Sequence, residues 1–298
     1  MSTVVLVHGG AGTVDAALRE AARAGVEAAA AAGRRALRDG ADAEAAAVAA
    51  VRVLEDDPTF NAGRGACMTS EGTFETDASI MLGDGRVGAV GAVSDLADAI
   101  VVARKVLHES RHVLLVGAGA AAFARAHGVG TFDRAALLTD KAQARYEAAT
   151  AGHSSIDGQA DTVGAIVRDA AGNLAVACST GGVLLKTPGR VGDTPLVGAG
   201  LFADESGAAC ATGVGEAIIG RVASYEVLRR VARGQSPDEA AADVCREAAG
   251  RDATCGLILV LADGRVGLAH HSPHMSWALA RGDARIEAAI EVGPRGPA

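Results

Sequence analysis

The sequence lacks the features of membrane-spanning and secreted proteins. No apolar run approaches the roughly eighteen residues that a membrane helix requires, and residues 1–12 contain no basic segment followed by a long apolar core. The five cysteines, at positions 67, 178, 210, 245 and 255, are an odd number and form no C-x-x-C pair. This spacing favours reduced thiols over a disulfide framework or a zinc site. We therefore expect a soluble, cytoplasmic protein.

Basic residues are also scarce. The 298 residues include 28 Lys or Arg and 36 Asp or Glu, which gives a net charge of −8. The one dense basic group, Arg34, Arg35 and Arg38, lies on a single helical segment and does not indicate a nucleic-acid partner. Hydrophobic residues make up 49% of the chain, which excludes disorder and is enough for a sizeable core. No repeat or linker divides the sequence, so we expect one domain over residues 1–298.

The chain alternates between helical and strand patterns. Alanine-rich stretches at 15–39 and 42–54 carry apolar residues at helical spacing, and residues 4–7 form a short apolar strand pattern. From Thr162 to Cys178, two β-prone runs flank a turn, which predicts a hairpin. Two similar hairpins are expected at 73–93 and 257–270. The central hairpin is notable for the residue that opens it.

A loop rich in Gly, Ser and Asp runs directly into Thr162. If the bond between Asp161 and Thr162 is cut, Thr162 gains a free α-amine, with a reference pKa of about 7.7–8.0, beside its own hydroxyl nucleophile. The Thr162 hydroxyl could make the cut itself, by attacking the Asp161 carbonyl to form an ester that water opens. The alternative is a loop that leads into an ordinary strand, and an Asp-Thr pair alone favours that alternative.

Two further loops carry groups suited to binding a small polar ligand. Arg190 and Asp193 lie three residues apart in a glycine-rich loop. A guanidinium binds a carboxylate through two parallel hydrogen bonds, and an aspartate accepts from an ammonium, although such a pair can also be a simple ion pair. Residues 212–216, Thr-Gly-Val-Gly-Glu, open a predicted helix that extends toward Arg233. The free N–H groups at a helix start suit an oxyanion.

Other motifs give weaker signals. The glycines after His8 are not followed by the Lys-Ser or Lys-Thr of a phosphate-binding loop. Residues 117–122 match a dinucleotide fingerprint, but no strand ending in a ribose-binding acid follows, so a helix-packing glycine pair is the better interpretation. The histidines at 270, 271 and 274 lack nearby acidic or cysteine partners for a metal. Asn61, just before Gly63, is most simply a turn residue.

Six of these motifs, in this order, resemble the plant-type asparaginases, also called isoaspartyl peptidases, which are N-terminal-nucleophile hydrolases. The motifs occupy residues 8–12, 60–65, 161–164, 179–182, 188–195 and 212–216. The resemblance extends from residue 4 to about residue 282 and includes residues 273–277. Six ordered motifs are far more specific than any single one.

The resemblance implies an α+β fold, the four-layer αββα sandwich of this hydrolase class, and a role for each site residue. Thr162 would be the autocatalytic cleavage site, after Asp161, and then the nucleophile, which leaves fragments 1–161 and 162–298. Thr180 would hydrogen-bond near the hydroxyl and the amine of Thr162, and Asn61 would help to position the Thr162 amine. Arg190 and Asp193 would hold the α-carboxylate and the α-ammonium of an L-aspartyl group. Thr212 and Gly213 would stabilise the oxyanion. The full set of predicted substrate-binding residues is Arg190, Val191, Gly192, Asp193, Thr212, Gly213, Val214 and Gly215.

The family also carries a sodium ion, held mainly by backbone carbonyls. The equivalent residues here are Leu54, Glu55, Asp57, Phe60, Ala62 and Arg64. The Leu-Glu-x-x-Pro-x-Phe-Asn-Ala-Gly spacing is kept, so a structural Na⁺ is expected. The resemblance implies no cofactor for catalysis, and it implies a dimer of cleaved αβ units.

The expected reaction is hydrolysis of L-asparagine and of β-aspartyl dipeptides through a β-aspartyl ester on Thr162. The fine substrate preference stays open, because Val183-Leu184-Leu185-Lys186 stands where many relatives have Met-Thr-Asn-Lys, and Val214 stands where polar or aromatic residues are frequent. One alternative is a glycosylasparaginase-like amidase acting on N-glycan-linked asparagine, which the absence of a signal peptide disfavours. The other is an unprocessed protein that binds aspartate without catalysis.

Overall fold

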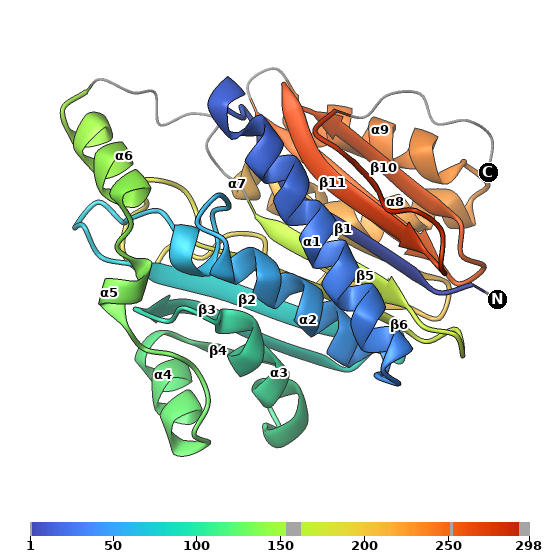
Figure 1. Cartoon of the computed structure of the whole chain (residues 1–298), viewed down its shortest axis with the longest axis horizontal. Helices are drawn as coiled ribbons and strands as arrows, with labels where there is room; N and C mark the ends of the chain where they lie inside the picture. Colours follow the sequence, from blue (N-terminus) through green and yellow to red (C-terminus); the bar gives the residue numbers. More distant parts are fainter. Residues whose placement is uncertain (1, 153–161, 251–252, 292–298) are drawn as a thin grey trace.

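The structure, a computed structural model, describes residues 2–152, 162–250 and 253–291, and it contains two β-sheets (Figure 1). In spatial order, the larger sheet consists of β12 (Glu287–Ala289), β11 (His274–Arg281), β1 (Val4–Gly12), β5 (Val163–Arg168), β6 (Leu174–Thr180), β2 (Glu75–Leu82), β3 (Val87–Ser94) and β4 (Leu114–Val116). The smaller sheet consists of β10 (Val266–His271), β9 (Cys255–Leu261), β8 (Gly207–Gly213) and β7 (Leu201–Asp204). Only the pairing of β3 with β4 is parallel among these strands. All three predicted hairpins are confirmed.

Helices pack against both sheets. On the larger sheet lie α1 (Arg19–Arg38), α2 (Ala43–Asp56) and α3 (Ala99–Glu109), as Figure 1 shows. On the smaller sheet lie α8 (Ala223–Ala232) and α9 (Pro237–Ala249), with α7 (Gly215–Arg221) before them. The other described helices are α4 (Gly117–Ala126), α5 (Arg134–Leu137) and α6 (Asp140–Thr150). The mixed helix and sheet content agrees with the expected class, and none of the described helices is both long and apolar enough to cross a membrane.

The two sheets face each other through apolar side chains. Leu6 and Ile166 of the larger sheet pack with Ile258 of the smaller one, whereas their neighbours Val5 and Val167 belong to the core under α1 and α2. This division follows from the two-residue period of a strand, which sends successive side chains to opposite faces. Because both faces are covered, these strands carry apolar residues at nearly every position.

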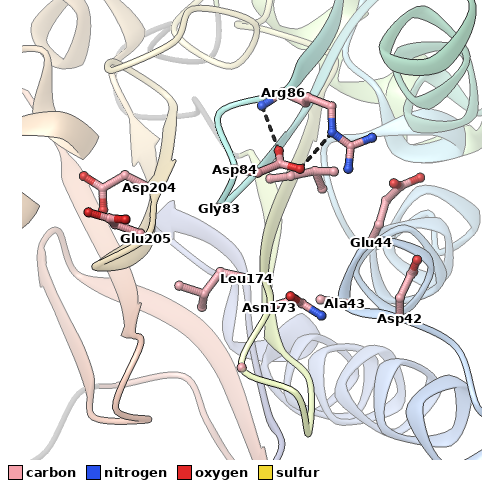
Figure 2. A pocket seen from close by; sticks show the side chains of 12 residues that line it. Asp42, Ala43, Glu44, Gly83, Asp84, Arg86, Asn173, Leu174, Asp204 and Glu205 are labelled. Atoms are coloured by element: carbon pink, nitrogen blue, oxygen red, sulfur yellow. Dashed lines mark hydrogen bonds and ion pairs between the residues drawn. The ribbon is translucent and has the colours of Figure 1, made fainter.

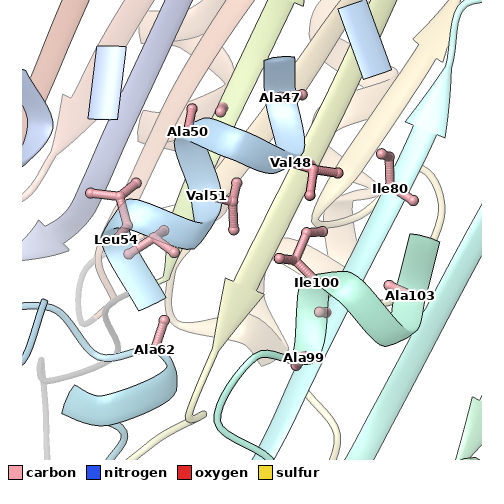
Figure 3. Packing of buried hydrophobic residues seen from close by; sticks show 14 of the residues in the cluster. Ala47, Val48, Ala50, Val51, Leu54, Ala62, Ile80, Ala99, Ile100 and Ala103 are labelled. Carbon is pink, nitrogen blue, oxygen red and sulfur yellow. The ribbon is translucent and has the colours of Figure 1, made fainter. Parts of the chain in front are cut away.

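The core under α1 and α2 is built largely from small side chains. In α1, the buried face includes Ala22, Val26, Ala29 and Gly33, which follow helical spacing. A Cβ atom at Gly33 would lie 2.9 Å from Cγ1 of Val5, so glycine there allows the helix to approach β1 closely. Figure 3 shows the same kind of packing where α2 meets α3 above the sheet. Each buried methylene contributes about 0.8 kcal/mol, so this core depends on many small contributions.

The prediction for the first strand needed correction. Residues 4–7 were expected to form a strand that ends at His8, but β1 continues to Gly12. The extension pairs with β11, which the sequence analysis did not predict, and the pairing shifts between His8 and Ala11. Gly10 lies inside this irregularity with φ of 113°, a conformation that glycine adopts readily.

The predicted helix from Thr212 toward Arg233 is wrong in two respects. Thr212 and Gly213 end strand β8, and the helical segment breaks at Val222, where φ is 50° and ψ is 49°. The break is stabilised from outside the helix. The amide of Ser224 donates to the carbonyl of Ala199 at 3.2 Å, and the amide of Tyr225 donates to the carbonyl of Gly198 at 2.9 Å. Tertiary hydrogen bonds therefore replace part of the helical ladder, which sequence periodicity could not indicate.

Val222 should carry measurable strain, because a β-branched residue rarely adopts the left-handed conformation. Its side chain is also 44% exposed, so little packing is at risk. We expect Val222→Asn to raise the free energy of unfolding by about 1 kcal/mol, since asparagine tolerates this conformation better. Thermal unfolding would measure the gain. Val113→Asn is the control, because Val113 is 58% exposed and does not adopt a positive φ. An equal gain there, or a loss at Val222, would contradict the interpretation.

Candidate active site

Thr162 lies where β5 begins, between the two sheets. The residue is 4% exposed, and its neighbour Val163 pairs with Ser179 of β6. The amide of Thr162 donates to Oγ1 of Thr212 at 3.2 Å, and the hydroxyl of Thr212 lies 3.4 Å from the carbonyl oxygen of Thr162, to which it can donate. Two threonines that are 50 residues apart in sequence are thus in direct contact. Asp161, the other predicted cleavage residue, lies outside the described residues.

A small cavity opens beside Thr162 and gathers most of the predicted site. Its lining residues are Thr162, Thr180, Gly182, Val183, Arg190, Gly192, Asp193, Gly213 and Gly215. All but two of them were predicted from the sequence as catalytic or substrate-binding residues. Of the exceptions, Gly182 ends the 179–182 motif and Val183 directly follows it, so both could have been found by extending the prediction at Thr180. Four segments spread over residues 162–215 therefore meet at one place.

Thr180 and Asn61 hold the loop that forms one wall of this cavity. Oγ1 of Thr180 accepts from the amide of Gly182 at 3.0 Å. Nδ2 of Asn61 donates to the carbonyl of Gly182 at 2.6 Å, and its Oδ1 accepts from the amide of Cys67 at 2.9 Å. Asn61 is not one of the lining residues, and these bonds place it behind the Gly182 wall. Its expected role in positioning the Thr162 amine stays a prediction.

Asp193 brings a buried negative group to the cavity. Its side chain is 3% exposed, and among the described residues its Oδ2 has no hydrogen-bond partner. Burial raises the pKa of Asp193 to about 7, although the nearby positive charge of Arg190 acts in the opposite direction. A buried carboxylate oxygen without a donor is well suited to accept from the ammonium of a ligand.

Arg190 is paired with Glu216, at the start of α7. Nε of Arg190 donates to Oε1 of Glu216 at 2.9 Å, and Nη2 donates to Oε2 at 2.8 Å. This is the two-bond geometry by which arginine binds carboxylates, and it lowers the pKa of Glu216. A ligand carboxylate that binds Arg190 must share or replace these bonds. The sequence analysis quoted Glu216 in its motif but gave it no role.

The turn from β8 to α7 depends on two glycines. Gly213 has φ of 131°, and a Cβ atom there would lie 2.2 Å from the carbonyl oxygen of Thr254. A Cβ atom at Gly215 would lie 2.9 Å from Oδ1 of Asp193. Any larger residue at 215 would therefore crowd the two charged groups of the site.

Three of the predicted substrate-binding residues do not line the cavity: Thr212, which contacts Thr162 directly, and the two valines Val191 and Val214. Val191 packs toward Gly91, where a Cβ atom would lie 3.1 Å from its Cγ2. The amide of Val214 donates to the carbonyl of Thr254 at 2.9 Å. Both valines belong to the segments that form the cavity, but they contribute to the shape of those segments rather than to their inner surface.

His8 is a neighbour that the sequence analysis did not assign to the site. It is fully buried and pairs with Gly164, so it lies close to Thr162. Burial lowers the pKa of His8 to about 3, and the nearby backbone of Thr162 opposes this shift. The ring makes no hydrogen bond of good geometry with the described residues. The imidazole is therefore neutral at physiological pH.

The predicted ion-binding loop runs from the end of α2 past Arg64. A Cβ atom at Gly63 would lie 2.4 Å from the carbonyl oxygen of Glu55, and one at Gly65 would lie 1.7 Å from that of Phe60. These glycines keep the surroundings of the carbonyl oxygens free of side chains. The carbonyls of Asp57 and Ala62 each accept one backbone N–H, which leaves each a second lone pair. A set of uncharged oxygens of this kind fits a monovalent cation.

A larger cavity, of about 580 Å³, lies at the opposite end of the strands. As Figure 2 shows, it is lined by the β2–β3 turn, the β5–β6 turn and the start of α2, and most of its charged groups are acidic. None of the predicted site residues reaches it. Within the described ranges, no three His, Cys, Asp or Glu side chains are arranged to hold a metal. The histidines at 270, 271 and 274 are among the residues searched and form no such group.

The chain matches known proteins over most of its length. The family model described as asparaginase matches residues 1–290. The isoaspartyl peptidase/L-asparaginase of Bos taurus is 40% identical, with 98% of this chain and 97% of the relative covered, and that of Danio rerio is 39% identical, with 94% and 93% covered. The plant-type L-asparaginase of Pyrococcus abyssi is 37% identical, with 92% and 95% covered. On the strength of a match over nearly its whole length, this chain belongs to the asparaginase family.

Proposed function

We propose that this protein is a self-processing enzyme that hydrolyses L-asparagine to L-aspartate and ammonia and also hydrolyses β-aspartyl dipeptides. The observation that carries the proposal is the convergence of Thr162, Arg190, Asp193 and Gly213 on one cavity. Together they supply an attacking group, a binding group for each charge of an amino acid, and an N–H donor for an oxyanion. Membership of the asparaginase family supports the same reaction.

Self-processing would begin with attack of the Thr162 hydroxyl on the carbonyl carbon of Asp161. Breaking of the peptide C–N bond would then give an ester on Oγ1 and a free amine on Thr162. Water would open this ester, which releases the carboxylate of Asp161 and restores the hydroxyl of Thr162. The contact between the nitrogen of Thr162 and Oγ1 of Thr212 supports this step, because it would give the new amine a hydrogen-bond partner. Fragments 1–161 and 162–298 would stay together as one domain, since β5 lies between β1 and β6 of the same sheet.

In the catalytic cycle, Arg190 would bind the α-carboxylate of the substrate and Asp193 its α-ammonium. The Thr162 amine takes the hydroxyl proton as Oγ1 attacks the side-chain carbonyl, and it passes that proton to the leaving nitrogen as the C–N bond breaks and ammonia departs. Water then opens the β-aspartyl ester; the amine accepts the water proton and returns it to Oγ1 as aspartate is released. The N–H of Gly213 and the hydroxyl of Thr212 would stabilise the oxyanion, and loss of one such donor typically costs about 2.7–4 kcal/mol.

The remaining features of the proposal rest on family membership. The two facing sheets with helices packed on each are compatible with a four-layer αββα sandwich of the N-terminal-nucleophile type. A dimer of cleaved units and a cytoplasmic location stay predictions. Catalysis would need no cofactor, since each proton transfer is assigned to a group of the protein or the substrate.

Replacement of the nucleophile should abolish both processing and catalysis. Thr162→Ala is expected to purify as one intact chain that releases no ammonia from L-asparagine, because neither ester can form. Denaturing electrophoresis and an ammonia assay measure the two effects. Thr131→Ala, an exposed threonine hydrogen-bonded to Asp98, should still give two fragments and full activity. A Thr162→Ala variant that is cleaved or active would rule out the mechanism. A wild type that prefers glycosylated asparagine to L-asparagine would instead favour the glycosylasparaginase-like alternative.

The pH dependence should reveal Asp193. Its pKa of about 7 means that the free enzyme protonates this carboxyl, and loses ammonium binding, as the pH falls through about 7. In the substrate complex the bound ammonium keeps Asp193 ionised, so only kcat/KM reports its titration. The Thr162 amine, with a reference pKa of about 7.7–8.0, must be unprotonated in both states. On the acid side, we therefore expect the plot of log kcat/KM against pH to have a slope of about two, because two groups must lose a proton, and the plot of log kcat to have a slope of about one. Equal slopes in the two profiles would argue against the role of Asp193.

A structural Na⁺ in the loop after α2 is the third element of the proposal. It would be held by the backbone carbonyls of Leu54, Glu55, Asp57, Phe60, Ala62 and Arg64, and no catalytic step passes through it. Replacing sodium with choline at equal ionic strength should lower the thermal midpoint, because an ion at 100 times its Kd stabilises the folded state by about 2.7 kcal/mol. Restoration by added sodium is expected. An identical midpoint in the two salts would contradict a bound sodium ion.

A further inference from the structure

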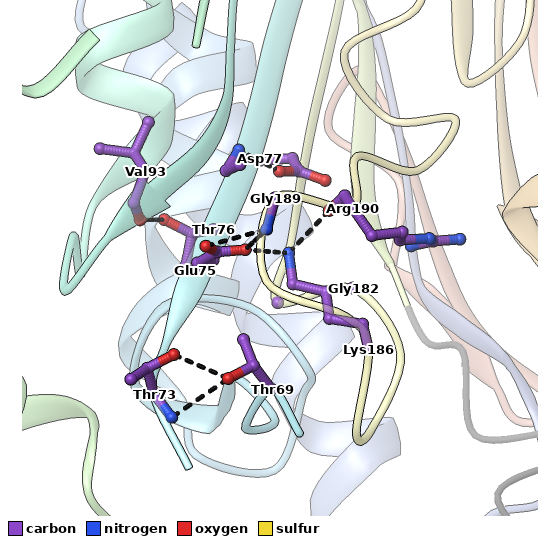
Figure 4. A network of polar contacts seen from close by, with 12 residues as sticks. Thr69, Thr73, Glu75, Thr76, Asp77, Val93, Gly182, Lys186, Gly189 and Arg190 are labelled. Carbon is purple, nitrogen blue, oxygen red and sulfur yellow. Dashed lines mark hydrogen bonds and ion pairs between the residues drawn. The ribbon is translucent and has the colours of Figure 1, made fainter. Parts of the chain in front are cut away.

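The backbone of the loop that carries Arg190 and Asp193 is held by buried charged side chains. The amide of Gly189 donates to both carboxylate oxygens of Glu75, at 2.9 and 3.1 Å. Nζ of Lys186 donates to the carbonyl of Arg190 at 3.0 Å, and the amide of Gly192 donates to Oδ2 of Asp77 at 3.3 Å. Figure 4 shows Glu75 and Lys186 meeting at this loop. Three charged groups therefore fix the loop within a span of four residues.

These charges are removed from solvent. The side chain of Lys186 is 0% exposed and that of Glu75 is 11% exposed, and their nearest charged atoms are 3.4 Å apart. Asp77 is also fully buried, and burial raises its pKa while the positive charge of Lys186 lowers it. Burying such groups is costly, and an apolar set of similar volume is often at least as stable. The cluster is therefore better explained by what it positions than by the stability it adds.

The position of the cluster links it to the site. Glu75 and Asp77 are two residues apart on β2, and Asp77 pairs with Thr180 of β6. In Figure 4 the guanidinium of Arg190 extends away from Lys186, so the cluster holds the Arg190 backbone and leaves its side chain available. The segment also contains Leu185 at φ of 57°, a conformation that a residue other than glycine keeps only when surrounding contacts impose it.

We propose that Lys186, together with Glu75 and Asp77, is a positioning group that sets the affinity of the site for the two charges of its substrate. The cluster fixes Arg190 and Asp193 relative to Thr162 through the loop backbone, without touching the substrate. This inference rests on the proposed function, because it assumes that Arg190 and Asp193 bind an aspartyl group. It assigns a role to the lysine that follows the altered segment Val183-Leu184-Leu185.

The test compares Lys186→Met, Glu75→Gln and the double variant with the wild type. Each single variant leaves one buried charge unpaired and should lower the thermal midpoint. Each should also raise KM for L-asparagine and Kd for L-aspartate, measured by calorimetry, by about tenfold, with kcat changed much less, because ground-state and transition-state binding are lost together. Lys105→Met is the matched control, since Lys105 pairs with Glu109 on the surface of α3, and it should behave as wild type.

The double variant separates positioning from stability. Removing both charges should raise the thermal midpoint above that of Lys186→Met, because Glu75 no longer carries an unpaired buried charge, although Asp77 still lacks its cation. KM and Kd should stay raised because the loop has lost its fixed charges. Recovery of KM together with the midpoint, or an unchanged KM in Lys186→Met, would overturn the inference. If Lys186→Met does not fold, the double variant and Asp77→Asn make the same comparison. The proposed function is tested separately, on the wild type alone. A wild type that neither binds L-aspartate nor releases ammonia would overturn the proposed function, whatever the variants do.

Discussion

The contact between Thr162 and Thr212 is the interaction on which the site depends. It joins the first residue of the hairpin in the larger sheet to the last part of β8 in the smaller sheet. The sheets can meet this closely because a glycine lies beside the contact. At Gly164 of β5, a Cβ atom would lie 2.9 Å from Sγ of Cys210 in β8 of the other sheet. The apolar core between the sheets then keeps the two threonines together.

Electrostatics divides the surroundings of this contact into groups that bind and groups that support. Within the described part of the chain, Asp193 has a buried oxygen without a donor, and Arg190 forms its ion pair with the exposed carboxylate of Glu216, so both can respond to a charged ligand. Lys186 and Glu75, in contrast, are paired with each other and with the loop backbone. A charged amino acid would thus meet two adjustable groups carried by a fixed loop. This arrangement is what preorganisation of a small polar site requires.

The site could be predicted from sequence better than some of the elements that carry it. Residues such as Arg190 and Asp193 stood out because a cation and an anion in one glycine-rich loop have a specific chemical use. The hairpin at Thr162 followed from alternation and a clear turn. Contacts made only through tertiary structure gave no such signal. The burial of His8, the pairing of Arg190 with Glu216 and the break at Val222 all depend on segments that are distant in the chain. Strand β11 was missed, because it is defined by its pairing with β1.

The most direct test of the central claim, that Thr162 becomes a chain terminus and then the nucleophile, is the intact mass of the wild-type protein during turnover of L-asparagine. The account predicts two masses, for residues 1–161 and 162–298, and an aspartyl adduct on the second fragment when the reaction is quenched rapidly. A single uncleaved chain that still hydrolyses L-asparagine would contradict it.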